Sequence, residues 1–526
     1  MTLKNWVVQI YLWLMLGIFP LYYQNKYFDM GDAKYTFFKT ATLGFLAIAV
    51  VVWLGNIFVQ PNEKKKDLKR VGESFSAQDI TVLAYLVLAV ISWLISPYRS
   101  DAWRGSIEWY MGLFSQLLFC GIYFVISRWG TEKPWHLWIA GGSAVLVFVL
   151  SYLHRFKIDP LGFYDGVAEK LWSSFLGTIG NATWYSSYIC VVLPVFIGIY
   201  LFIEHKKSHI YAVVHKLLLV LIFCGFATLF TQNSDSAYVG MGLAYLFYLW
   251  YAMGNPKLWL RFLETLMIGT LAMKITGVLQ LTFPEHVVKL TKISFALTKE
   301  PATWGLLAFV VILYLITLYL IKKQAVVFGE NGSAWKTIRK IRTIIYILII
   351  VAILSIPIIM WLATTGKIAE GTGLIWKTGY FIFDDKWGTL RGQNWKYAVR
   401  IFKEFPLEMK LFGCGPDSMC YYSAAFHQAE MTEMWNGVIV TNAHNEWLTA
   451  LINYGIFGAL AYVSIFASAI ILAVRGWKKN SLMIIAGASV IAYMGHNFFC
   501  YQQVVCTPLI FIVIAMAEYY RRNYMN

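Results

Sequence analysis

The chain has 526 residues, of which 59% are hydrophobic and only 14% are charged. This composition excludes an ordinary soluble domain, because runs of roughly 17–25 apolar residues, each long enough to span a bilayer, recur along the chain. The runs do not alternate as barrel strands do, and the net charge of +16 falls largely between them. An all-α polytopic integral membrane protein is therefore predicted, not a β-barrel or a nucleic-acid-binding protein.

The apolar runs predict about 12–14 transmembrane helices. The first run, 6–23, lacks an evident cleavage site for a signal peptide and is expected to be a span. The candidate spans are residues 6–23, 38–59, 78–96, 111–127, 136–153, 185–203, 215–231, 237–253, 258–278, 303–321, 343–363, 446–474, 481–499 and 505–519.

Alternate connections between these spans are basic, which by the positive-inside rule makes them cytoplasmic together with both termini. The opposite set then faces outward and includes the long segment 364–445, so His444 is expected outside. The basic connections contain Lys64, Lys65, Lys66, Lys69, Arg70, Lys206, Lys207, Lys322, Lys323, Lys336, Arg339, Lys340, Arg342, Arg475, Lys478, Lys479, Arg521 and Arg522.

The stretch 388–406 predicts a basic amphipathic helix on the outer surface. Thr389 is a candidate N-cap, which places Arg391 in the first turn, where free backbone N–H groups favour anions. The alternative is an interfacial helix that grips lipid headgroups. The apolar positions are Trp395, Ala398, Val399, Phe402 and Phe405, Pro406 ends the run, and the basic positions are Lys396, Arg400 and Lys403.

A histidine, His444, stands at the mouth of the apolar run that continues to Val474. The ordinary pKa of histidine lies near neutrality, which suits proton transfer. The alternative is that His444 is an interfacial residue with no catalytic role. Three further polar sites lie at span ends, each with a plain alternative: Asn181 as a helix cap, Ser234 in an ordinary turn, and Arg104 extending toward lipid phosphates. The cysteines in the outer loops, where the possibility of a disulfide stays open, are Cys414, Cys420, Cys500 and Cys506.

The run His444-Asn445, followed after nine residues by Gly455-x-x-Gly458, resembles the signature of the O-antigen ligase family. That family shares its core with O-antigen polymerases and bacterial O-linked oligosaccharyltransferases. The resemblance covers residues 170–475. The order of the other elements fits as well: Gly180-Asn181, the polar turn 231–236, Gly388-Thr389-x-Arg391 with Trp395, Pro406, and Gly413-x-Gly415-Pro416.

Two positions depart from the family pattern. Asp235 stands where the family often has arginine, so a phosphate contact is missing there or comes from another residue such as Arg104 or Arg155. Ala459 stands where ligases often have threonine. The resemblance divides the chain into N-terminal helices at 1–169, a catalytic core at 170–475 with its outer loop 364–445, and C-terminal helices at 476–526.

The resemblance implies an inverting glycosyltransferase of the bacterial plasma membrane, with no metal or other cofactor. It would move a glycan from a polyprenyl (undecaprenyl) diphosphate lipid to a hydroxyl on a lipid, glycan or protein, on the outer face. His444 is the expected general base and Arg391 the expected stabiliser of the leaving diphosphate. The remaining expected residues are Asn445, Arg400, Arg104, Asn181 and Ser234 for substrate, and Gly455 and Gly458 for structure.

Three other functions stay open. An O-antigen-type polysaccharide polymerase would share the motifs. A lipid-linked glycan flippase or transporter needs charged residues in mid-span, and Lys274 and Glu264 are the main examples. A non-catalytic scaffold in envelope assembly is kept open by the departure at Asp235.

Overall fold

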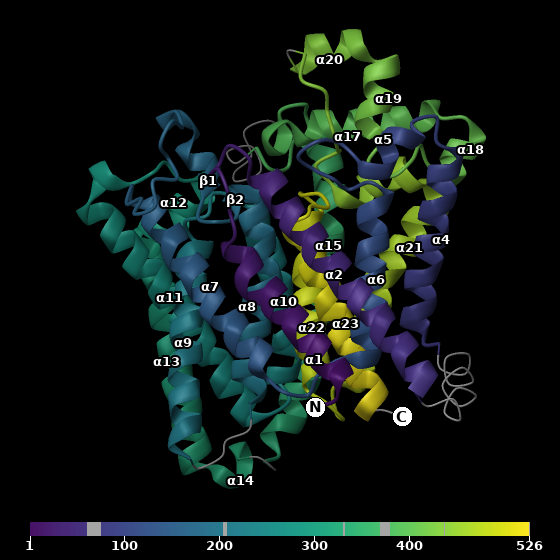
Figure 1. Ribbon diagram of the computed structural model, residues 1–526. Helices are drawn as coiled ribbons and strands as arrows, with labels where there is room; N and C mark the ends of the chain where they lie inside the picture. Colours follow the sequence, from purple (N-terminus) through teal and green to yellow (C-terminus); the bar gives the residue numbers. More distant parts are fainter. Residues whose placement is uncertain (60–74, 204–207, 330–331, 369–378, 436, 525–526) are drawn as a thin grey trace.

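The computed structural model of the protein describes residues 1–59, 75–203, 208–329, 332–368, 379–435 and 437–524. It is a bundle of long, roughly parallel helices with a layer of shorter helices across one end (Figure 1). This arrangement confirms the predicted all-α membrane protein, because nine described helices are long and apolar enough to cross a membrane. Two shorter apolar helices, Leu113–Trp129 and Leu482–Asn497, lie on predicted spans as well.

The long helices of the bundle follow the predicted apolar runs, with π- and 3₁₀-helical turns at 14–21, and shorter helices lie between them. The only described strands, β1 (Phe175–Leu176) and β2 (Gly180–Asn181), pair antiparallel. The helices are α1 (Leu3–Trp13), α2 (Met30–Val59), α4 (Ala77–Ile95), α5 (Arg99–Arg104), α6 (Leu113–Trp129), α7 (Trp135–Arg155), α8 (Ala182–Phe202), α9 (His209–Leu229), α10 (Ser236–Ala252), α11 (Pro256–Thr282), α12 (Lys292–Lys299), α13 (Trp304–Lys323), α14 (Ala325–Phe328), α15 (Ala334–Thr364), α17 (Trp387–Glu404), α18 (Leu407–Phe412), α19 (Met419–Phe426), α20 (Gln428–Trp435), α21 (Glu446–Gly476), α22 (Leu482–Asn497) and α23 (Thr507–Tyr524).

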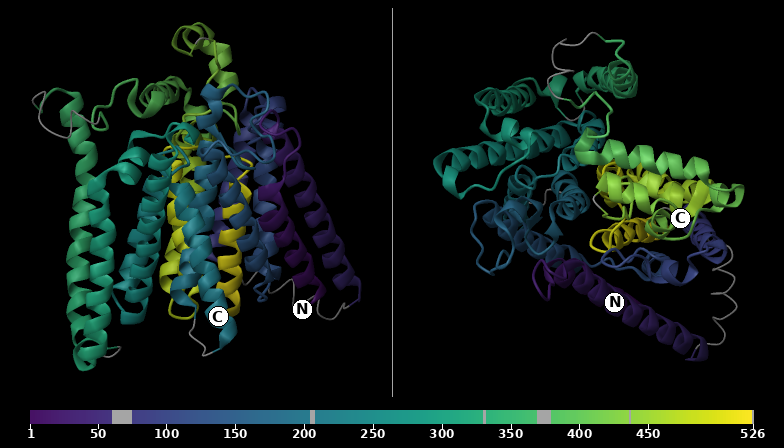
Figure 2. Two further views of the ribbon diagram at one scale, coloured as in Figure 1. Left: turned by 90° about the vertical axis from the view of Figure 1, so that its left-hand side faces the viewer. Right: turned by 90° about the horizontal axis from the view of Figure 1, so that it is seen from above.

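The core of the bundle lies around α8 and α22, which pack against each other and against α10. Most of α8 is buried, whereas α13 and α15 are exposed along nearly their whole length. In a membrane protein such exposed apolar helices face lipid rather than water. Figure 2 shows α15 standing at one edge of the bundle.

The short helices α17–α20 gather at one end of the bundle, which we call the loop end; both termini and α14 lie at the other end (Figure 1). The basic connection that contains α14 therefore lies opposite His444, as the charge pattern predicts. The predicted basic residues at 64–70 and 206–207 fall outside the described residues.

All seven cysteines are free thiols, so no disulfide joins the four cysteines at the loop end. Cys414, Cys420, Cys500 and Cys506 are buried. One charged side chain inside the bundle is held by backbone carbonyl oxygens. Lys34, which the sequence reading missed, is completely buried, and its Nζ donates to the carbonyl oxygens of Phe19 and Pro20 at 2.7 and 3.0 Å.

Candidate functional site

The start of α21 fixes the backbone of His444. Asn445 is the N-cap, and its Oδ1 accepts from the N–H of Leu448 at 3.0 Å. His444 itself has a left-handed φ of 49° and donates its own N–H to Oδ1 of Asn442 at 2.9 Å. Two asparagines therefore hold the histidine at the helix mouth in a conformation that L-residues seldom adopt.

The His444 ring lies edge-on to Tyr501, with ring centroids 5.1 Å apart. Tyr501 is held in turn by Trp184, whose Nε1–H donates to its hydroxyl at 3.2 Å, and by the ring of Trp109 at 4.7 Å. Burial, together with the smaller effect of the positive charge of Arg391, lowers the pKa of His444 to about 4. His444 is thus neutral at pH 7, as a general base must be.

Arg391 follows an unusual turn at the start of α17. Gly388, Thr389 and Leu390 all have left-handed φ angles, between 58° and 68°. The prediction that Thr389 is an N-cap is wrong, because the cap position is Lys386 and no side chain caps this helix end. The left-handed turn carries Arg391 back toward the bundle instead of presenting it on a regular first helical turn.

The Arg391 guanidinium is anchored by two carbonyl oxygens. Nε donates to Phe499 at 2.9 Å and Nη1 to Gly388 at 2.6 Å. Its Nη2 has no hydrogen-bond partner among the described residues. Burial lowers the pKa of Arg391, while Tyr501 and Asp235 among its neighbours act in the opposite direction. Arg391 and His444 therefore flank the same connection between α22 and α23.

A groove of about 660 Å³ runs between α17 and the start of α21. Its polar lining carries three basic side chains from one face of α17 and Asn445, the neighbour of His444. Its apolar lining is largely aromatic. The residues are Phe383, Trp395, Lys396, Val399, Arg400, Lys403, Asn445, Trp447, Leu448 and Phe498. A groove with cationic and aromatic walls suits a ligand that combines negative charge with sugar or apolar parts.

Comparison with known proteins addresses this part of the chain directly. Residues 288–463, which contain α17, His444, Gly455 and Gly458, match the family model described as O-antigen ligase. This segment, about a third of the chain, is similar to the O-antigen ligase family. Members of the family are glycosyltransferase-type enzymes, ligases or polymerases, and the multi-pass membrane architecture agrees with that class. No curated protein matches the chain.

A buried polar network centred on Glu446 lies beneath His444. The carboxylate accepts from the hydroxyls of Tyr462 at 2.5 Å and Tyr493 at 3.1 Å, and from the amide of Asn497. Gln502 extends the network by donating to the Tyr462 hydroxyl at 3.2 Å. A buried carboxylate with several donors is well satisfied, so Glu446 ties the mouth of α21 to the end of α22.

A break in α21 docks the Gly413-x-Gly415 turn, which lies in the matched region 288–463. Gly455 has a φ of 64°, and the N–H groups of Cys414 and Gly415 donate to Ile452 and Asn453 carbonyls at 3.0 and 3.1 Å. A Cβ at Gly455 would meet backbone of Leu411 at 2.4 Å. Gly458, by contrast, would meet Tyr454 across the break at 2.4 Å. Gly455 thus lets the outer segment contact the span backbone directly.

Asp417, next to this turn, is a buried carboxylate that sequence reading left without a role. Its Oδ2 accepts from the N–H groups of Ser106 at 2.8 Å and Met111 at 3.2 Å. Burial raises its pKa to about 7. Asp417 therefore fixes the loop 105–112, which carries Trp109 against Tyr501.

The polar turn before α10 is built around Asp235, the departure from the family pattern. Its carboxylate accepts from the hydroxyls of Thr291 at 2.8 Å and Tyr380 at 3.1 Å. Ser234 is buried, with its hydroxyl 2.8 Å from that of Ser236. Asp235 links the turn to the outer segment and adds negative charge near Arg391.

Other predicted residues lie away from His444 or are engaged elsewhere. Arg400 lines the groove but forms an ion pair with Glu430. The Asn181 Oδ1 caps α8 by accepting from Thr183 N–H at 2.8 Å. Arg155 is buried and donates to the carbonyl oxygens of Trp172 and Gln232. Arg104 lies in a separate pocket. No cluster of three metal-ligating side chains occurs within the described residues.

Sequence reading missed Tyr501 and Glu446 as parts of this site. Glu446 was visible as an acid directly after His444-Asn445 at the start of an apolar run, a costly position for a charge without partners. Tyr501 carries no such signal, because its contact with His444 joins residues that are distant in the chain.

Proposed function

We propose that the protein transfers a glycan from a polyprenyl diphosphate lipid to an acceptor hydroxyl at the outer face of the bacterial plasma membrane. The observation that carries the proposal is the pairing of a neutral His444 and a carbonyl-anchored Arg391 on either side of the connection after α22. The family match supports a glycosyltransferase. The outward orientation rests on the basic connections at the opposite end.

In this reaction the acceptor oxygen attacks the anomeric carbon while its proton passes to the His444 imidazole. The new bond forms opposite the bond to the lipid diphosphate, which breaks with its electron pair and inverts the anomeric configuration. Proton transfer of this kind contributes typically ~10²–10⁴-fold to the rate.

The leaving diphosphate needs positive charge in a site of low dielectric. The Arg391 Nη2, which has no partner among the described residues, is the candidate donor, since Nε and Nη1 already fix the guanidinium in place. Preorganised donors of this kind are typically the largest electrostatic contribution. The basic residues of the groove would hold further phosphate oxygens.

Transport of the same lipid is less well supported. Lys274 donates to Thr298, Glu300 and Thr303, and Glu264 accepts from Tyr200 and Tyr314. The two charged residues of α11 are thus satisfied by neighbouring groups instead of lining a polar path.

The decisive experiment is transfer by purified protein in liposomes that contain a labelled polyprenyl-diphosphate glycan and candidate acceptors. His444→Ala and Arg391→Ala should each reduce product formation by at least ~10²-fold. His286→Ala and Arg475→Ala, which change exposed residues of the same types, are the matched controls. Unimpaired transfer by His444→Ala, or movement of the lipid between leaflets without product, contradicts the proposal. The acceptor that receives the label distinguishes ligase from polymerase.

A further inference from the structure

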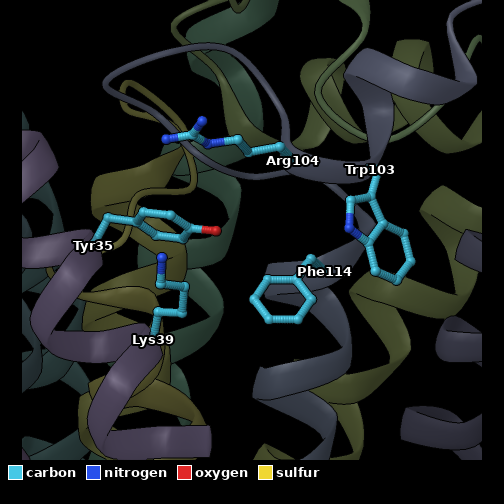
Figure 3. A pocket seen from close by; sticks show the side chains of 5 residues that line it. All are labelled: Tyr35, Lys39, Trp103, Arg104 and Phe114. Atoms are coloured by element: carbon cyan, nitrogen blue, oxygen red, sulfur yellow. The ribbon is translucent and has the colours of Figure 1, made fainter.

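A second pocket, of about 330 Å³, lies between α2, α5 and α6 at the loop end of the bundle. It is lined by Tyr35, Lys39, Trp103, Arg104 and Phe114 (Figure 3). None of these residues belongs to the region that matches the O-antigen ligase family, and none lines the groove beside His444. The pocket is therefore separate from the candidate catalytic site.

The pocket contains two positive charges. Figure 3 shows the Arg104 guanidinium above Tyr35 and the Lys39 ammonium below it. Lys39 Nζ lies 5.3 Å from the Tyr35 ring centre, and Arg104 Cζ lies 5.0 Å from that of Tyr110. The two tyrosine rings are stacked, 4.1 Å apart. The stacked tyrosines therefore place both positive charges beside the same pocket.

No carboxylate neutralises these cations within the described part of the chain. Neither the Lys39 side chain nor the Arg104 side chain forms an ion pair or a hydrogen bond there. The neighbouring acid, Asp32, instead accepts a hydrogen bond from the Tyr110 hydroxyl. Two adjacent positive charges repel each other, so the pocket gains most from an anion that contacts both.

The position of the pocket selects a lipid anion. Lys39 lies on a candidate span, about 13 Å along α2 from Met30 at 1.5 Å per residue. Trp103 is 42% exposed and packs against Phe114 with ring centroids 5.7 Å apart. Exposed aromatic residues at a span end are typical of the headgroup layer of a membrane.

We propose that Lys39 and Arg104 bind the phosphate group of a membrane lipid in this pocket, with Trp103 and Phe114 against its glycerol or first apolar carbons. The loop 105–112 separates this lipid from His444, because Tyr110 stacks on the pocket side while Trp109 packs on Tyr501. The site is a binding site, and its existence does not depend on His444 being catalytic.

The test is a native mass spectrometry titration of the full chain in a phosphate-free maltoside detergent. The probes are short-chain phosphatidylglycerol, a polyprenyl phosphate and inorganic phosphate. Lys39→Gln/Arg104→Gln should weaken binding of the lipid phosphates by about tenfold or more, equivalent to about 1.4 kcal/mol. Lys4→Gln/Arg475→Gln removes the same two charges at the other end and should leave the affinity within about twofold.

Each outcome decides the proposal. Weaker lipid binding by Lys39→Gln/Arg104→Gln alone supports the proposal. The lipid that binds more tightly identifies the source of the phosphate. Equal binding by the pocket variant and the control overturns it. Equal affinity for inorganic phosphate overturns the assignment to a lipid. A charge-keeping variant, Lys39→Arg/Arg104→Lys, should retain binding, and its loss in a protein with unchanged thermal unfolding overturns the role of charge. Glycan transfer is not the readout, so a failure here is distinct from a failure of the proposed function.

Discussion

The side-chain amide of Asn497 on α22 donates a hydrogen bond to the carboxylate of Glu446 on α21. Glu446 lies two residues after His444, and Asn497 lies two residues before Phe499, whose carbonyl anchors Arg391. The pair thus connects the backbone that carries the proposed base to the backbone that positions the proposed cation. We therefore expect the geometry of this pair to influence the separation of His444 and Arg391, on which the proposed reaction depends.

Removing the Glu446 carboxylate should loosen this connection. Glu446→Ala leaves the donors of Tyr462, Tyr493 and Asn497 without their acceptor, a cost of about 1–3 kcal/mol. Glu446→Gln keeps one acceptor and should fall between the wild type and the alanine variant. Thermal unfolding in detergent measures the stability, and kcat should fall more than KM rises. Equal stability and kcat in all three proteins would show that the pair does not position the site.

The pH dependence of transfer should reveal the depressed pKa of His444. A general base is active when it is neutral, so activity is complete above its pKa and is lost as the pH falls through that value. With a pKa of about 4, the acid limb lies well below the ordinary value of 6.5. Initial rates of transfer between pH 3.5 and 8 check this, with unfolding monitored in parallel. A midpoint near 6.5 in folded protein contradicts the buried, neutral imidazole.

Gly455→Ala should destabilise the protein by at least about 1–2 kcal/mol, since an L-residue is strained at this φ and its Cβ would meet the Leu411 backbone at 2.4 Å. Gly305→Ala is the matched control. Gly305 is helical and has open space for an added Cβ. The substitution should therefore leave the protein's stability unchanged or raise it by about 0.5–1 kcal/mol. Thermal unfolding of both variants tests the difference, and equal midpoints would argue against the docking role of Gly455.

Asp417 should make stability depend on pH. Its folded pKa of about 7 lies above the ordinary value of 3.8, so its contribution is complete below 3.8 and is lost as the pH rises through 7. Asp417→Asn keeps an oxygen acceptor for Ser106 and Met111 but does not titrate. The melting temperature of wild type relative to this variant should fall between pH 5 and pH 8. A constant difference across that range contradicts the raised pKa.

The span pattern and the family could be read from the sequence because hydropathy and the His444 to Gly458 spacing are local features. The site could not be read to the same depth. The left-handed turn before Arg391 has only one glycine among its three residues, and propensity gives no reason to expect it at Thr389 and Leu390. The contacts of Arg391 with Phe499, and of His444 with Tyr501, join segments that only the packed bundle brings together. The domain boundaries and residue roles remain predictions.

The hydrogen bonds from Cys414 and Gly415 to the broken turn of α21 have a consequence for engineering. The segment 364–445 cannot be exchanged between relatives independently of the rest of the protein. Its backbone supplies hydrogen bonds to the carbonyl oxygens at the break in α21. In a chimera that exchanges residues 364–445 alone, the carbonyl oxygens of Ile452 and Asn453 would have to accept hydrogen bonds from a segment of a different sequence. Grafts designed for new acceptors must carry the segment and α21 together.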